Sequence, residues 1–131
     1  MKPVILCVDD EKIVLVNLIQ QLKSFFGTQF QLETAESAEE ALEVIEDVSS
    51  PIILLITDWL MPGMKGDEFL IQFSQKHPNT ISIMLSGQAD DSAVERAVKE
   101  AKLYAFIKKP WQKDELIEII QKAIDNLNNN P

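Results

Sequence analysis

The sequence predicts an α/β protein in which five parallel strands form a doubly wound sheet with helices on both faces. Two observations favour this (βα)5 arrangement. Short apolar runs alternate along the chain with segments of helical periodicity, and the runs at 4–8 and 52–56 lack polar alternation. Uninterrupted apolar character is typical of strands that are buried on both faces of a parallel sheet. Right-handed crossovers then place the connecting helices on either side of the sheet.

The five apolar runs mark the expected strands. They are residues 4–8, 30–32, 52–56, 81–85 and 104–107. The runs at 4–8 and 52–56 lack polar alternation, which favours central positions in the sheet. The run at 30–32 alternates between apolar and polar residues and is therefore expected at an edge.

Each expected strand is followed by a segment with apolar residues at helical spacing. These apolar positions fall within residues 14–25, 38–45, 67–76, 94–101 and 116–127. Ser37 and Glu40 form a capping box that predicts the start of the second helix. Pro78 ends the third helix, because the residue before a proline disfavours the helical conformation.

The chain length of 131 residues suits a single domain. A chain of this size buries roughly two-thirds of its unfolded surface, so one core is enough to stabilise it. Residues 1–125 are expected to form the domain. Residues 126–131 are polar and rich in asparagine, and they are either a tail or the start of a linker.

A formal net charge of −9 argues against two kinds of partner. Nucleic-acid backbones and anionic membrane surfaces would repel the protein, so we expect no direct contact with either. The apolar runs are too short to span a membrane or to form a signal peptide. Cys7 is the only cysteine and is expected to be a buried thiol. A cytoplasmic protein is the simplest interpretation.

Polar side chains directly follow four of the five expected strands. Asp9 and Asp10 come after the first strand, Asp58 after the third, Ser86 after the fourth and Lys109 near the end of the fifth. In an open parallel sheet, function gathers at the carboxyl ends of the strands. The sequence therefore predicts that these side chains converge in one crevice.

Three carboxylates in one crevice would repel each other. Two unit charges about 4 Å apart repel by about 4 kcal/mol at an effective dielectric near 20. Oxygen ligands select a hard cation, and Mg²⁺ commonly combines carboxylates with waters and a phosphate. Three aspartates and Lys109 sum to −2, which one Mg²⁺ would neutralise. A different interpretation stays open for single residues, because Asp10 or Glu11 could simply cap the first helix.

Four segments resemble the motifs of response-regulator receiver domains. They are Val8-Asp9-Asp10-Glu11, Asp58-Trp59-Leu60-Met61-Pro62 with Gly66, Leu85-Ser86-Gly87 and Lys109-Pro110-Trp111. The motifs occur in the family's order, and the resemblance covers nearly the whole chain. It implies a flavodoxin-like sheet with the strand order 2-1-3-4-5. In the second segment, Gly66 is expected to allow close packing at the start of the third helix.

The resemblance implies that the protein is a signalling switch rather than an enzyme with a separate substrate. Asp58 would accept a phosphoryl group from the phosphohistidine of a sensor histidine kinase or phosphotransfer protein, forming an aspartyl phosphate. Asp10, Asp58 and the backbone carbonyl of Leu60 would bind Mg²⁺, and Asp9 would act largely through a metal-bound water. Such a domain catalyses its own phosphorylation and dephosphorylation.

The resemblance also assigns the cationic and hydroxyl groups. The family lysine directly precedes proline, which selects Lys109 over Lys108, and adjacent strand residues point to opposite faces. Lys109 would pair with Asp58 and then with the phosphoryl oxygens, and Ser86 would hydrogen-bond one of these oxygens. The bond between Lys109 and Pro110 is expected to be cis.

Phe106 occupies the aromatic switch position of the family. It is either a core aromatic residue or a ring that swings inward when Ser86 moves toward the phosphate. The face formed by the fourth helix, fifth strand and fifth helix would meet a downstream output domain or protein. The same face could form a homodimer, and the sequence does not choose between monomer and dimer.

Three positions near the acceptor depart from the family or vary within it. Ser86 replaces the commoner threonine but keeps the hydroxyl, so little change is expected. Leu60 and Gln88 are at variable positions that tune attack by water on the aspartyl phosphate. Because the apolar Leu60 cannot orient a water, we expect slow to moderate loss of phosphate.

Three rival functions fit the sequence less well. A haloacid-dehalogenase-like phosphatase needs an acid two residues after its aspartyl nucleophile, where this chain has Leu60. A flavodoxin-like nucleotide binder needs a hydroxyl- or glycine-rich phosphate loop after the first strand, where this chain has three acids. A degenerate receiver used only for docking would not need the intact set of site residues.

Overall fold

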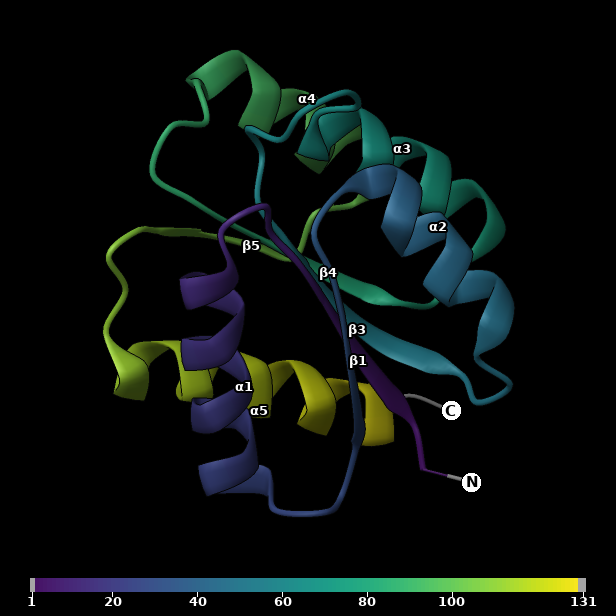
Figure 1. Ribbon diagram of the computed structural model, residues 1–131, viewed down its shortest axis with the longest axis vertical. Coiled ribbons are helices and arrows are strands. Elements are labelled where there is room, and N and C mark those ends of the chain that lie inside the picture. Colours follow the sequence, from purple (N-terminus) through teal and green to yellow (C-terminus); the bar gives the residue numbers. More distant parts are fainter. Residues whose placement is uncertain (1, 130–131) are drawn as a thin grey trace.

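A computed structural model describes residues 2–129 of the chain and has the predicted doubly wound fold (Figure 1). Five strands form one parallel sheet in the order β2-β1-β3-β4-β5, which confirms the expected strand order. The elements are β1 (Val4–Val8), α1 (Lys12–Phe26), β2 (Gln31–Ala35), α2 (Ala38–Asp47), β3 (Ile52–Thr57), α3 (Gly66–Lys76), β4 (Ile81–Ser86), α4 (Asp91–Ala101), β5 (Ala105–Lys108) and α5 (Lys113–Asn129).

Helices α1 and α5 cover one face of the sheet, and α2, α3 and α4 cover the other (Figure 1). The core accordingly has two apolar clusters, one on each face. Strand β1 contributes to both: Leu6 and Val8 pack under α2 and α3, whereas Ile5 and Cys7 pack under α1 and α5. Every residue of β1 is buried, so its lack of polar alternation follows from its central position. The expected burial of Cys7 is confirmed.

Strand β2 is the element whose limits the sequence predicted least well. It spans Gln31–Ala35 instead of residues 30–32. As an edge strand it pairs only with β1, and most of its residues are partly accessible to solvent. Polar residues such as Glu33 and Thr34 are tolerated there, so an apolar run does not mark the extent of the strand.

The helix starts follow local chemistry. The hydroxyl of Ser37 accepts a hydrogen bond of 3.0 Å from the backbone N–H of Glu40, as a cap of α2 should. Helix α3 begins at Gly66, whose N–H donates to the carbonyl of Trp59. A methyl group at Gly66 would overlap the carbonyl oxygen of Asp58, which confirms that this position needs a glycine for close packing.

The last helix continues further than the sequence suggested. Helix α5 runs through Asn129, so four residues of the expected polar tail are helical. Asn130 and Pro131 lie outside the described residues, and the domain boundary near residue 125 stays a prediction. Within residues 2–129, no helix combines the length and the apolar character that crossing a membrane requires.

Candidate functional site

The acids after β1 and β3 meet at the carboxyl edge of the sheet. These two strands are parallel neighbours with Val8 opposite Thr57, so the next residues, Asp9 and Asp58, leave the sheet side by side. The backbone N–H of Asp58 donates to the carbonyl of Val8 (2.9 Å) and fixes this junction. Asp9, Asp10, Glu11 and Asp58 each place one carboxylate oxygen within 4.8 Å of the others.

Asp9 is the most buried member of this acidic cluster, with 1% of its surface exposed. Its Oδ1 accepts a hydrogen bond from the backbone N–H of Glu11 (2.9 Å), and its Oδ2 accepts one from Nζ of Lys109 (2.6 Å). Burial raises the pKa of Asp9, because it disfavours the charged form, and the two hydrogen bonds oppose this effect. Both oxygens are therefore already engaged within the protein.

Asp58 is also buried, but its carboxylate lines an open cleft. Its Oδ1 accepts a hydrogen bond from the backbone N–H of Trp59 (2.8 Å). Its Oδ2 lies 3.4 Å from Nζ of Lys109. The ion pair between Asp58 and Lys109 that the resemblance implies is thus present, although the ammonium lies closer to Asp9.

Lys109 reaches the site from the end of β5, whereas Lys108, the last residue of β5, is exposed. Burial alone disfavours the ammonium of Lys109. The hydrogen bond to Asp9 and the charge of Asp58 outweigh it, so the pKa of Lys109 is raised and the group stays charged. The peptide bond between Lys109 and Pro110 is cis, as the resemblance implies.

A cleft of about 270 Å³ joins these groups. It is lined by Asp10, Glu11, Asp58, Leu60, Ser86, Gly87, Gln88 and Lys109. Ser86 is buried at the end of β4, and its hydroxyl accepts a hydrogen bond of 3.3 Å from the backbone N–H of Gln88. Leu60, two residues after Asp58, is 42% exposed. The loops after β1, β3, β4 and β5 therefore bring every predicted site residue together except Phe106.

Phe106 lies on β5 outside this cleft. Its side chain belongs to an exposed position of the strand, with 37% of its surface accessible, and Met84 is its neighbour in β4. The ring is therefore not part of the core in this conformation. Val98 of α4 and Tyr104 are exposed apolar side chains as well.

Glu11 is a member of the acidic cluster, although the sequence interpretation gave it no role in the site beyond its place in the first family motif and considered it as a helix cap. It does precede α1, but its side chain makes no capping hydrogen bond and lies 3.9 Å from Nζ of Lys109. Four carboxylates and one ammonium leave a charge of −3 at the cleft. An oxygen-only donor set with this excess of negative charge fits a hard divalent cation such as Mg²⁺.

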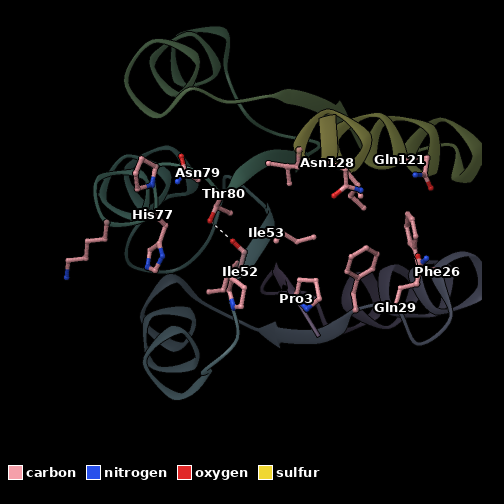
Figure 2. Close-up of a pocket in the computed structure, with 16 residues that line it drawn as sticks. Pro3, Phe26, Gln29, Ile52, Ile53, His77, Asn79, Thr80, Gln121 and Asn128 are labelled. Atoms are coloured by element: carbon pink, nitrogen blue, oxygen red, sulfur yellow. Dashed lines mark hydrogen bonds between the residues drawn. The ribbon is translucent and has the colours of Figure 1, made fainter. Parts of the chain in front are cut away.

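A larger cavity, of about 790 Å³, lies at the opposite end of the sheet (Figure 2). It is bordered by the chain just before β1, β3 and β4, where Thr80 donates a hydrogen bond to the carbonyl of Ile52 (2.6 Å). Phe26 and Phe30 are among its apolar lining residues. No carboxylate is among its described lining residues, so the smaller cleft is the better candidate for cation and phosphoryl chemistry.

Comparisons with known proteins agree with this site. Residues 5–121 match the response regulator receiver domain family. The hydrogenase transcriptional regulatory protein HoxA of Cupriavidus necator is 31% identical over 121 residues, which make up 92% of this chain and 24% of that regulator. The chemotaxis protein CheY of Listeria monocytogenes is 36% identical over 89 residues, which make up 68% of this chain and 72% of that protein.

A solved structure extends the similarity to the whole fold. The CheY-like response regulator receiver domain protein from Methanospirillum hungatei superposes with a TM-score of 0.87 at 30% identity, covering 98% of both chains. This chain belongs to the response regulator receiver domain family, whose members are signalling switches in two-component systems. It spans about a quarter of the length of HoxA.

Proposed function

We propose that this receiver domain is a phosphoacceptor and that Asp58 takes the phosphoryl group. The observation that carries the proposal is the carboxylate of Asp58 lining the cleft, with Lys109 at 3.4 Å and Ser86 in the same wall. An oxygen of Asp58 attacks the phosphorus of a donor phosphohistidine in line. A P–O bond forms, the P–N bond breaks, and the imidazole leaves with the electron pair.

The acidic cluster supports the expected metal dependence. Asp10, Asp58 and the backbone carbonyl of Leu60 would hold Mg²⁺ directly. Asp9 would act through a water, since both of its oxygens are already hydrogen-bonded. When bound, Mg²⁺ neutralises negative charge on the acids and on the transferred group.

Two further side chains act on the arriving phosphoryl group. The ammonium of Lys109 faces Oδ2 of Asp58 and is the cation that pairs with phosphoryl oxygens once the aspartyl phosphate has formed. The hydroxyl of Ser86 donates a hydrogen bond to another of these oxygens. The protein thus contributes orientation and charge stabilisation rather than a separate nucleophile or base.

Partners follow from the same chemistry. The donor is a sensor histidine kinase or a phosphotransfer protein, and the protein works in the cytoplasm. Phosphorylation alters the face formed by α4, β5 and α5, where Val98, Tyr104 and Phe106 are exposed. This face contacts a downstream output domain or protein, or a second copy of the chain, with Ser86 and Phe106 as switch residues.

Mass spectrometry of the intact protein tests the proposal. After incubation with acetyl phosphate and Mg²⁺, the wild type should gain one phosphoryl group and Asp58→Asn should gain none. Asp91→Asn, an exposed acid at the start of α4, is the matched control and should be phosphorylated like the wild type. A phosphoryl adduct that persists in Asp58→Asn would move the acceptor to another residue.

A further inference from the structure

The residue after the acceptor links it to the start of α3. The backbone N–H of Trp59 donates to Oδ1 of Asp58 (2.8 Å), and its indole N–H donates to Oδ1 of Asp67 (3.0 Å). Asp67 lies in the first turn of α3 and is only 8% exposed. The ammonium of Lys65 lies 5.0 Å from the centre of the Trp59 ring and holds the indole from another side.

The second oxygen of Asp67 continues this connection to α4. Oδ2 of Asp67 lies 3.5 Å from Nη1 of Arg96. The Nε of Arg96 is hydrogen-bonded to Glu100 one turn further along α4 (3.0 Å). A continuous series of polar contacts therefore runs from Asp58 through Trp59 and Asp67 to Arg96.

The side chains that α4 buries completely are small. They are Ala93, Ala97 and Ala101, of which Ala97 and Ala101 belong to the core cluster that also contains Phe69 and Leu70 of α3. Burying a methyl group removes far less apolar surface from water than burying a leucine or phenylalanine side chain. Elements with little buried apolar surface are the ones that move most easily. The ion pair between Asp67 and Arg96 adds a polar contact between α3 and α4 to this packing.

We propose that Asp67 and Arg96 are positioning residues that couple the acceptor site to α4 through the indole of Trp59. The inference rests on the proposed function in one respect: phosphorylation of Asp58 is the event that the coupling transmits. Because coupling between two sites is reciprocal, removing the contact between Asp67 and Arg96 must also change Mg²⁺ binding at the acceptor site.

The test uses the full-length protein labelled with ¹⁵N. The indole N–H signal of Trp59 is assigned by its loss in Trp59→Phe and followed during titration with Mg²⁺. Arg96→Gln should shift this signal and weaken Mg²⁺ binding about five-fold, the lower range of typical coupling effects. Arg96 is half exposed, so the variant should fold normally. Glu100→Gln, which removes the exposed partner of Arg96, is the control and should change neither readout.

A second variant separates positioning from simple charge effects. If only long-range charge mattered, Asp67→Asn would weaken Mg²⁺ binding and Arg96→Gln would strengthen it. If the two residues form one link, both variants weaken binding, and the double variant is no weaker than the worse single variant. Opposite effects that cancel in the double variant would overturn the proposal.

The readouts also distinguish this proposal from the proposed function. The indole signal and the Mg²⁺ midpoint do not require phosphorylation, so a wild type that gains no phosphoryl group would contradict the proposed function only. An indole signal that moves no more in Arg96→Gln than in Glu100→Gln would overturn the coupling, whatever the outcome of phosphorylation.

Discussion

At the scale of single residues, burial controls the titration of Cys7, the one ionisable side chain of β1. The thiol of Cys7 is completely buried, and desolvation raises its pKa from 9.0 to about 12. Between pH 9.0 and about pH 12, the thiol of the unfolded chain is mostly ionised, whereas the thiol of the native state keeps its proton. The native state therefore binds more protons across this interval, and its stability must fall as the pH rises through it.

We predict that this effect is visible in urea unfolding at about pH 7.5 and about pH 10. Between these two values, Cys7 should cost the wild type about 1.4 kcal/mol of stability that Cys7→Ala does not lose. The advantage of the wild type over Cys7→Ala should therefore shrink by that amount. An advantage that stays constant would mean that the native thiol titrates as freely as an exposed one.

Leu60 provides a second prediction at this scale. Its side chain lines the cleft beside Asp58 and offers no group that could orient an attacking water. After removal of acetyl phosphate, the phosphorylated wild type should lose its phosphoryl group over minutes or longer. Leu60→Gln should shorten this lifetime and Leu60→Met should not, as followed by intact mass. A half-life of seconds for the wild type would contradict the expectation.

Single residues also show how far the sequence could predict the site. Asp9, Asp10, Asp58, Ser86 and Lys109 were predictable because each follows a strand whose carboxyl end lies at the same edge of the sheet. The contact between Asp67 and Trp59 was not, since it depends on how α3 packs against the loop after β3. Such packing leaves no periodic signal in the sequence.

At the scale of elements, the start of α3 shows how closely a helix can approach the loop after β3. A Cβ at Gly66 would overlap the backbone of Asp58 and Trp59, whereas a Cβ at Gly87 would make ordinary contacts with Lys109. The backbone at Gly66 cannot accommodate a side chain unless α3 or the loop moves.

We therefore predict that Gly66→Ala destabilises the protein by about 1–3 kcal/mol, the usual cost of overpacking. It should also weaken Mg²⁺ binding, because the displaced backbone carries Asp58. Gly87→Ala is the matched control and should change stability by less than about 0.5 kcal/mol in chemical denaturation. Equal stability of the two variants would show that α3 adjusts without strain.

Elements with two buried faces were predicted most accurately. The limits of β1 agree with its apolar run, and β3 and β4 each extend one residue further, to the buried polar residues Thr57 and Ser86. The edge strand β2 and the end of α5 were predicted less well. Solvent-exposed polar residues occur both in regular elements and in loops, so hydropathy alone does not show where the element ends.

At the scale of the whole molecule, the net charge of −9 and the acidic cluster act in the same direction. Both favour binding of a divalent cation, and an ion that binds only the native state stabilises it. At ten times its Kd, Mg²⁺ should add about 1.4 kcal/mol to the free energy of unfolding.

Thermal unfolding with and without Mg²⁺ measures this effect. We expect Mg²⁺ to raise the Tm of the wild type and of Asp91→Asn, but to raise that of Asp10→Asn much less. The control keeps the same net charge as Asp10→Asn, so any difference reports on the cleft and not on general screening. Equal increases in all three proteins would argue against a specific metal site.

The cleft draws its groups from nearly the full length of the chain, and Lys109 and Asp9, which share its shortest ion pair, are 100 positions apart in sequence. During translation the acids therefore emerge first and the ammonium much later. A product truncated before β5 has the acceptor but not the cation that faces it, so it cannot assemble the centre. Under the proposed function, a fragment that ends before β5 would therefore not accept the phosphoryl group.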